Sequence, residues 1–369
     1  MTPAIFVSNT NYLFTSGGGV QWCTRDYLET IAAAGLQAIV SAYDNDQRFL
    51  SRFRRKLRPR PFTDLINPTT VSKIVAEQKA SAARWIFLNN SEPLALAAAI
   101  KIAVGQEARV IYLSHGVEST DQLNDLRLDV GSIPPNRRQP AWIGRLFLAE
   151  LEQRRQLDGV VCVSEEDVLF ERWLGSENLC FLPRSVRQEF LDLRPVLGRV
   201  GTVGTLSHIP NLDGIRRLAV ELDRQTTVRL RLVGGPPTAG EKLAREFRSI
   251  EYVGQLDDAA LKKEAATWCA FVNPIFCQAR GISTKVATAL GWGLPVLTTA
   301  QGSRGYRWND AVLPRSQSPK ELAELSIHVA SDGDQKNWRA RATQLSQLAP
   351  DLREAGRALK DFLSRLAGE

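Results

Sequence analysis

The sequence is poor in the residues that build disulfide frameworks and zinc sites. Its five cysteines are odd in number and form no C-x-x-C pair, which argues against both a disulfide scaffold and a structural zinc site. Histidine is also sparse, with three residues in the chain. We therefore expect reduced, mostly buried thiols.

Long apolar runs are missing as well. The longest run, around residues 94–100, is far shorter than the roughly 20 apolar residues that a bilayer-spanning helix needs, so no transmembrane helix is expected. The first residues carry no basic segment, so a secretory signal is not expected either. The expected location is the cytoplasm, with peripheral attachment to the inner face of the membrane as an open alternative.

Signature motifs of several enzyme classes are absent. The sequence has no G-x-S-x-G elbow, Walker loop or H-E-x-x-H pair, which argues against hydrolases, P-loop kinases and metalloproteases. Two D-x-D triplets occur at residues 44–46 and 332–334, but neither has histidine or glutamate partners at metal-binding spacing. Both triplets are interpreted as turns, and no metal site is predicted.

What the chain does have is length and a regular alternation of segments. Its 369 residues exceed what one hydrophobic core usually serves, so two domains are expected. Short apolar segments alternate with helix-length amphipathic segments, a pattern typical of parallel sheets covered by helices. Strands are predicted at residues 5–8, 38–42, 85–89, 110–114, 160–164 and 179–182, and then at 200–204, 228–233, 251–253, 270–273, 295–298 and 311–313.

The two halves are separated by an aperiodic stretch. Residues 183–199 contain two prolines and a glycine, which are typical of a linker. We place the boundary near residue 190, giving domains at 1–190 and 191–340 and a terminal helical segment at 341–369.

The net charge of +7 favours an anionic partner. Residues 48–62 concentrate that charge, with seven cations, no acid and interleaved aromatics. An anionic membrane surface or an anionic acceptor is the favoured partner for this segment, nucleic acid is disfavoured, and a solvated basic loop stays open. Residues 142–151 are a second apolar candidate for such a contact, although a core helix is the commoner explanation.

The most informative segment follows the strand predicted at 270–273. A glycine loop there opens a helix and is followed by a lysine within one turn. Glycine lets backbone amides approach an anion, and the positive end of the helix dipole favours negative charge. The predicted phosphate-binding groups are the amides of Gly281, Ile282, Ser283 and Thr284 and the ammonium of Lys285.

Residues 280–296 resemble the donor-nucleotide half of the retaining GT-B glycosyltransferases of the family-4 type. Their pattern runs G-x-(I/T)-x-x-K-hydrophobic-x-E-A-x-x-x-G-x-P-V. The resemblance implies an α/β fold of two doubly wound, Rossmann-like domains that face each other across a cleft, with the last helix packing back on the first domain. It also implies transfer of a sugar, with retention and without a metal or other cofactor, from a UDP- or GDP-linked donor to a glycan, lipid-linked or protein acceptor.

Three further motifs fit that resemblance. Gly17, Gly18 and Gly19 precede a segment similar to the family's first helix, so they are expected to contact the donor. His115 follows a strand end where the family commonly has a histidine that touches the transferred sugar and stabilises the departing pyrophosphate. Ser207 is a candidate ligand of the β-phosphate, in a loop where N-capping by Asn211 or Asp213 is the alternative.

Two positions depart from the family pattern. Thr288 replaces a glutamate that accepts hydrogen bonds from the ribose hydroxyls, and Arg280 replaces an earlier glutamate. Arg280 and Thr288 are therefore expected to bind the nucleotide in an altered way. The family also often has Arg and Lys where Thr205 and Pro210 stand, so Arg280 is expected to support Lys285 at the diphosphate. The alternative is a non-catalytic GT-B-like subunit that binds a partner or glycan, and a GT-B epimerase or phosphorylase is a weaker rival because neither its carboxylates nor its lysine is evident.

Overall fold

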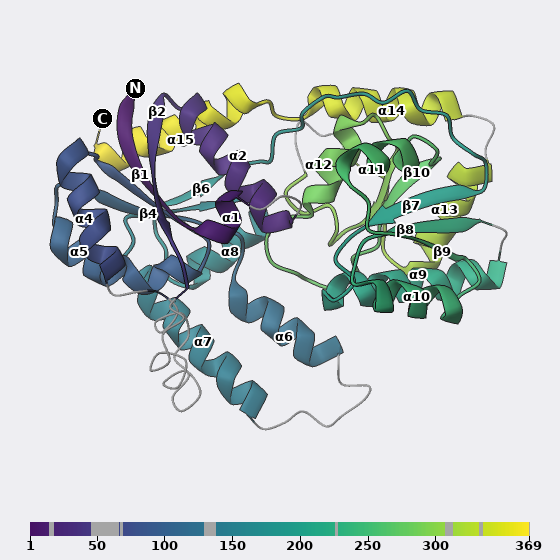
Figure 1. Cartoon of the computed structure of the whole chain (residues 1–369), viewed down its shortest axis with the longest axis horizontal. Coiled ribbons are helices and arrows are strands. Elements are labelled where there is room, and N and C mark those ends of the chain that lie inside the picture. Colours follow the sequence, from purple (N-terminus) through teal and green to yellow (C-terminus); the bar gives the residue numbers. More distant parts are fainter. Residues whose placement is uncertain are drawn as a thin grey trace.

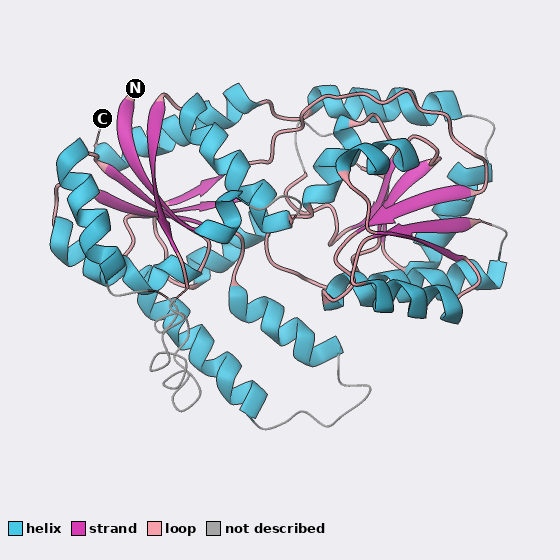
Figure 2. Cartoon of the chain, viewed as in Figure 1, coloured by secondary structure: helices cyan, strands magenta, loops and turns pink. Residues whose placement is uncertain are grey.

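The computed structural model describes residues 1–14, 18–45, 66, 69–128, 138–225, 228–306, 313–331 and 335–368. These residues form two parallel sheets, each covered by helices and lying in its own half of the molecule (Figures 1 and 2). The predicted α/β architecture of two doubly wound domains is confirmed. No helix in these ranges is long and apolar enough to span a membrane.

The first sheet has the strand order β2-β1-β3-β4-β5-β6. Its strands are β1 (Thr2–Asn9), β2 (Leu36–Tyr43), β3 (Trp85–Asn89), β4 (Arg109–Leu113), β5 (Gly159–Cys162) and β6 (Leu179–Phe181). The helices that accompany it are α1 (Thr10–Phe14), α2 (Gly19–Ala33), α4 (Thr69–Ser81), the 3-10 helix η1 (Glu92–Leu96), α5 (Ala97–Val104), α6 (Glu118–Leu128), α7 (Arg138–Arg154), α8 (Glu165–Trp173) and α15 (Leu352–Ala367).

Both faces of this sheet are buried, as a doubly wound fold requires. Along β1, Ala4 and Phe6 join the core on one face, whereas Ile5 and Val7 join the core on the other. Successive side chains of a strand point to opposite faces, so a continuous apolar run fills both cores at once. The uninterrupted apolar runs in the sequence therefore reflect burial on two sides.

The second sheet has the order β12-β11-β10-β7-β8-β9. Its strands are β7 (Arg199–Val203), β8 (Arg229–Val233), β9 (Ile250–Gly254), β10 (Ala270–Asn273), β11 (Val296–Thr299) and β12 (Arg315–Ser316). Its helices are α9 (Ile209–Gln225), α10 (Pro237–Glu246), α11 (Asp258–Ala265), α12 (Thr284–Gly291), α13 (Pro319–Ser331) and α14 (Gln335–Leu348).

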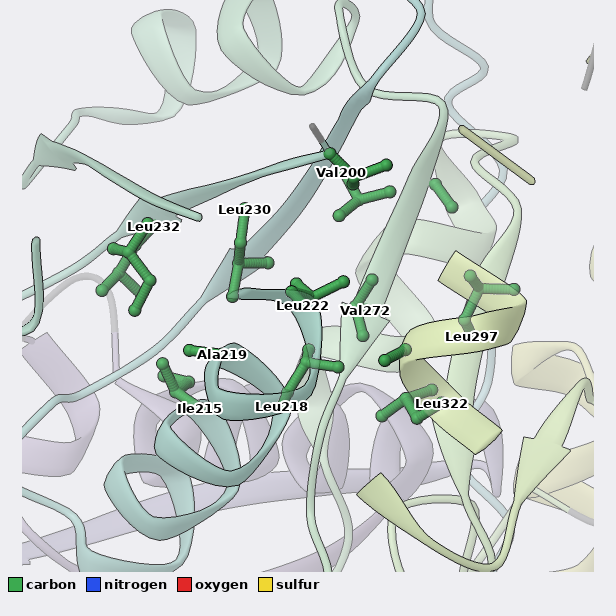
Figure 3. Packing of buried hydrophobic residues seen from close by; sticks show 14 of the residues in the cluster. Val200, Ile215, Leu218, Ala219, Leu222, Leu230, Leu232, Val272, Leu297 and Leu322 are labelled. Atoms are coloured by element: carbon green, nitrogen blue, oxygen red, sulfur yellow. The ribbon is translucent and has the colours of Figure 1, made fainter. Parts of the chain in front are cut away.

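Helix α9 shows how the sequence builds the core of the second domain (Figure 3). Ile215, Leu218, Ala219 and Leu222 are buried against the strands. Their spacing of three and four residues places them on one face of the helix. The stripe packs on strand residues such as Leu230 (Figure 3), and this packing fixes α9 and the loop before it.

The strand predictions at 85–89 and 270–273 agree with β3 and β10 to the residue. The last prediction, at 311–313, lies mostly outside the described residues, and the strand that the structure describes here is β12, Arg315–Ser316, paired with Thr298 and Thr299 of β11. Leu313 is buried just before this strand.

Residues 182–198 cross between the two sheets without a helix or strand. The chain returns at its other end, where α15 lies beside α2 (Figure 1). There Gly356 meets Ala33 so closely that a Cβ on Gly356 would lie 2.7 Å from the Ala33 Cβ. Ala355, Leu359, Phe362 and Leu363 of α15 are buried in the core of the first sheet.

Candidate functional site

Helix α12 begins in the loop that follows β10, and its first turn is fixed by side chains around it. The Ser283 hydroxyl donates to Asn273 Oδ1 at 3.1 Å instead of capping the helix. The Tyr306 hydroxyl donates to the Ser283 carbonyl at 2.7 Å and accepts from the Ala287 amide at 3.1 Å. The first turn of α12 is thus held at the carboxyl edge of the sheet, where parallel sheets bind ligands.

Lys285 extends from that first turn toward the loop after β7. Its Nζ donates to Asn211 Oδ1 at 3.0 Å, and Asn211 Nδ2 donates in turn to the Thr205 carbonyl at 3.0 Å. Burial lowers the pKa of Lys285 to about 8. Within the described ranges no carboxylate forms an ion pair with this ammonium, so a neutral amide is the partner that holds it.

The glycine loop of the first domain lies opposite. Gly18 is the N-cap of α2 and Gly19 is its first residue, whereas Gly17 lies outside the described residues. A Cβ on Gly19 would lie 3.6 Å from Thr284 Oγ1. The structure thus brings the N-termini of α2 and α12 together, and their dipoles favour an anion between them.

Backbone contact between the domains explains two further glycines. Gly116 and Gly281 have φ angles of 99° and 60°, a region that favours glycine. A Cβ on Gly116 would lie 2.3 Å from the Gly281 nitrogen, and one on Gly281 would lie 2.6 Å from the His115 carbonyl oxygen. The loops after β4 and β10 therefore meet main chain to main chain.

His115 is buried in the first-domain half of this junction. Its Nε2 lies 2.9 Å from Asn89 Oδ1. Asn89 Nδ2 donates to Ser8 Oγ at 3.0 Å and Thr24 Oγ1 at 2.9 Å. With the amide so assigned, Nε2 carries the proton and Nδ1 is the acceptor.

The charge of His115 follows from its surroundings. Burial, followed by the positive charges of Arg280 and Arg184, lowers the pKa of His115 to about 3. The imidazole is therefore neutral at physiological pH. A neutral ring supplies no positive charge to a pyrophosphate, so the expected role of His115 is restricted to hydrogen bonding and shape.

Arg280 does not lie where the sequence analysis expected it to act. Its guanidinium forms ion pairs with Glu118 and, at 3.0 Å, with Asp121 of α6. Its main-chain amide donates to Asp121 Oδ1 at 3.0 Å. Two first-domain carboxylates thus neutralise the charge that was predicted to support Lys285, and this expectation is corrected.

The carbonyls of the glycine loop are held by Arg304, which the sequence analysis missed. This buried guanidinium donates to the carbonyls of Gly281 at 2.5 Å, Gln301 at 2.7 Å and Arg280 at 3.0 Å. The carboxyl of Asp167 lies near the Gly281 amide, and burial raises the pKa of this carboxyl to about 6. The predicted amide cluster is therefore divided, because Gly281 faces an acid of the first domain and the first turn of α12 remains beside Lys285.

The remaining candidates lie near this junction with simpler surroundings. Ser207 is exposed in the turn before α9. Helix α9 begins at Ile209, so Asn211 and Asp213 lie inside it and the N-capping alternative is wrong. The Thr288 hydroxyl donates to the Thr284 carbonyl at 3.4 Å, one turn earlier. Ile282 packs in the cores of both domains.

Several earlier hypotheses fall outside the described residues or stay open. The basic segment 48–62 lies outside them, as do Asp46 of the first D-x-D triplet and the whole of the second, residues 332–334. The apolar segment 142–151 lies in α7, where Leu146 is buried and Leu148 is 59% exposed. That helix therefore contributes to the core and to the surface at once.

Comparison with known proteins agrees with this architecture. Residues 198–350 match the model of the family described as "Glycosyl transferases group 1". A search of curated proteins by sequence gives no match. Together with the solved structures that follow, the family match confirms the predicted resemblance to GT-B glycosyltransferases.

The solved structures share the whole fold at low sequence identity. HepE of Anabaena, in a structure titled as a complex with UDP and glucose, is 13% identical with a TM-score of 0.66, covering 99% of this chain and 100% of HepE. WaaG, titled as a glycosyltransferase involved in lipopolysaccharide biosynthesis, is 15% identical with a TM-score of 0.58, covering 98% and 99%. The apo lipopolysaccharide outer core galactosyltransferase WaaB is 12% identical with a TM-score of 0.58, covering 99% of both chains.

Proposed function

We propose that this chain is a glycosyltransferase that moves a sugar from a nucleotide diphosphate sugar, UDP- or GDP-linked, to an acceptor hydroxyl. The observation that carries the proposal is the Lys285 ammonium at the start of α12, which has a neutral amide partner and no carboxylate partner in the described ranges. A buried cation of this kind is stabilised when an anion binds. The helix start favours the same anion.

The chemistry of the site follows from this anion-binding position at Lys285 and the start of α12. Cleavage of the bond between sugar and diphosphate leaves negative charge on the diphosphate, and Lys285 with the first amides of α12 stabilises that charge as it develops. The sugar then lies toward Gly19 and His115 of the first domain, where the unprotonated Nδ1 of His115 accepts a hydrogen bond from a sugar hydroxyl. Ser207 is exposed in the neighbouring loop and reaches the phosphates from the α9 side.

Retention, metal independence and the pathway are the finer parts of this proposal. Retention comes from the resemblance of residues 280–296 to the retaining enzymes. The ammonium and helix dipoles of the protein supply the charge that a metal ion would otherwise provide, and no cofactor is invoked. The HepE structure is described as a complex with UDP and glucose, WaaG as an enzyme of lipopolysaccharide biosynthesis, and WaaB as a lipopolysaccharide galactosyltransferase. These similarities support a role of this chain in the synthesis of glycans or glycoconjugates.

Peripheral binding to an anionic membrane, from the cytoplasmic side, is part of the same proposal. The sequence of residues 48–62 is one support. A second is an exposed apolar patch on α7 and α8, where Leu148, Leu169 and Trp173 are 59%, 62% and 69% exposed. The rings of Phe147 and Trp173 lie 5.4 Å apart, so the two helices share this surface.

The flanking charge of that patch fits an anionic lipid surface. Arg145 and Arg172 are exposed on these two helices, and Arg155 is exposed directly after α7. Cations at the headgroups with Trp or Leu below them are typical of interfacial binding. Cosedimentation with phosphatidylglycerol vesicles should exceed that with phosphatidylcholine vesicles, and Trp173→Ser should reduce it. Equal sedimentation with both lipids would remove the membrane from the proposal.

Calorimetric titration with a panel of UDP- and GDP-sugars tests the donor. One nucleotide sugar should bind, and NMR of the product formed from it should show the anomeric configuration of the donor. The second candidate function, a non-catalytic subunit, is favoured by the ion pairs that Arg280 makes with Glu118 and Asp121, because they join the domains without a donor. Absence of heat with every nucleotide sugar would support that alternative.

A further inference from the structure

A polar cluster lies beside the proposed donor site, on the first domain. Its centre is Glu92, at the start of η1. The hydroxyl of Tyr12 donates to Glu92 Oε1 at 2.8 Å, and that of Tyr43 donates to Oε2 at 3.2 Å. Asn9 Nδ2 donates to Oε2 at 3.3 Å and to Asn45 Oδ1 at 3.1 Å.

The cluster has a buried floor and an open rim. Asn9, at the end of β1, and Tyr43, at the end of β2, are buried. Tyr12, Asn45 and Glu92 are partly exposed. Because the carboxyl ends of three adjacent strands converge here, the rim lies at the edge where parallel sheets bind ligands.

Asn90, two residues before Glu92 in the chain, has an unsatisfied polar group. The residue is 4% exposed, and its Oδ1 has no hydrogen-bond partner among the described residues. Its φ angle is 71°, an unusual backbone conformation that recurs at functional sites. A buried acceptor without a donor is unfavourable, and a ligand hydroxyl would satisfy it.

The same segment holds the donor-side histidine. Asn89, the last residue of β3, contacts His115 Nε2 at 2.9 Å, and Glu92 follows three residues later. The four residues from Asn89 to Glu92 thus connect the junction of the domains with the polar cluster. A molecule bound at the cluster would lie next to the proposed donor sugar.

The charge of the cluster selects the kind of molecule. Glu92 forms no ion pair with any described residue, and the nearby Arg280 is paired with Glu118 and Asp121. Burial, with the Glu92 carboxylate as a further cause, raises the pKa values of Tyr12 and Tyr43, so both phenols stay protonated donors. A carboxylate and amide oxygens accept from hydroxyls, and an unpaired carboxylate repels anions.

We infer that this cluster is the acceptor subsite and binds the hydroxyls of a neutral sugar, an inference that rests on the proposed glycosyltransferase function. Its ligand-binding side chains are those of Tyr12, Asn45, Asn90 and Glu92. Asn9 and Tyr43 position the Glu92 carboxylate from below.

Direct binding of neutral methyl glycosides tests the subsite without the need for turnover. The probes are the methyl glycosides of glucose, galactose, mannose and N-acetylglucosamine, titrated by ligand-observed NMR. At least one should bind the full-length protein saturably, and Glu92→Gln and Tyr12→Phe should each weaken it at least about tenfold. Glu107→Gln, at an exposed position, is the matched control and should leave the affinity unchanged.

Charge and donor controls complete the experiment. Methyl glucuronide should bind the wild type at least about tenfold more weakly than methyl glucoside. In Glu92→Gln the difference between the affinities for these two glycosides should be smaller. The inference is overturned if no neutral glycoside binds, or if Glu92→Gln and Tyr12→Phe both bind like the wild type while their melting curves show them folded. UDP titration reports separately on the proposed function, and a wild type that binds glycosides but not UDP would contradict that function alone.

Discussion

The two edges that meet between the domains carry opposite charge. On the second-domain edge, the ammonium of Lys285 lies at a helix N-terminus with only an amide partner in the described ranges. On the first-domain edge, the Glu92 carboxylate accepts hydrogen bonds from uncharged groups such as the Tyr12 hydroxyl. Glu118 and Asp121 on this edge form ion pairs with Arg280 and neutralise it. His115 on that edge is itself neutral.

In the proposed function, this difference in charge lets the two edges bind two unlike substrates. A diphosphate needs an uncompensated cation, which the second-domain edge provides. A hydroxyl acceptor needs hydrogen-bond acceptors without surplus positive charge, which the first-domain edge provides. In the proposed function, the unpaired Glu92 carboxylate would also repel a misplaced diphosphate, so that charge would direct each ligand to its own edge.

A substitution that pushes apart the loops joining the two edges should have the largest effect, and this effect is on stability. In Gly281→Ala the new methyl group would meet the His115 carbonyl oxygen at 2.6 Å, at a φ of 60°. We expect a loss of about 2–3 kcal/mol in the free energy of unfolding, measured by urea denaturation. Gly144→Ala, a position in α7 with no atom within 4 Å of the new methyl, is the control and should be neutral or slightly stabilising.

Removing the cation should have the next largest effect. Lys285→Ala deletes the charged donor of the second-domain edge, and the affinity for UDP should fall about 10- to 100-fold because a charge-assisted hydrogen bond is lost. Calorimetry measures the change, and Lys242→Ala, at an exposed site on α10, is the control. Unchanged affinity for UDP in Lys285→Ala would remove this lysine from the site.

Titrating the cation should reproduce part of that loss. The pKa of Lys285 is lowered to about 8, so the free protein loses this charge as the pH rises through 8. The affinity for UDP should be about tenfold weaker at pH 9 than at pH 7. This dependence of the UDP affinity on pH should vanish in Lys285→Ala. If the variant keeps the same pH dependence, another group causes it.

The same shift has a consequence of known sign for stability. Because the folded pKa of Lys285 lies below its ordinary value, the unfolded chain binds more protons between about pH 8 and 10.4. The contribution of this residue to the free energy of unfolding therefore rises with pH in that window.

Adding an acid to the second-domain edge should have the smallest effect. Thr288→Glu restores the glutamate of the family pattern, which accepts from ribose hydroxyls. UDP should bind about threefold more tightly while pyrophosphate binding does not improve, because one hydrogen bond to the ribose is gained. Equal changes for UDP and pyrophosphate would show that the side chain at 288 acts on charge alone.

The parts of this account that were readable from sequence are local ones. The glycine loop and Lys285 lie within five residues of each other, so the order of strand, loop and helix predicted their meeting. The fold class followed in the same way from the alternation of short apolar and amphipathic segments.

The features of the site that could not be predicted from the sequence depend on residues far apart along the chain. The acids that neutralise Arg280 lie about 160 residues away along the chain, and Tyr12 lies 80 residues from Glu92. The neutral state of His115 depends on burial and on Arg184 and Arg280. No local pattern in the sequence contains that information.

The most direct test of the central claim is a crystal structure of the protein with the nucleotide sugar that binds most tightly, at neutral pH. The account predicts a phosphate oxygen within hydrogen-bonding distance, about 3 Å, of Lys285 Nζ, with the first amides of α12 on the same diphosphate. Phosphates bound elsewhere, with Lys285 still held by Asn211 alone, would contradict it.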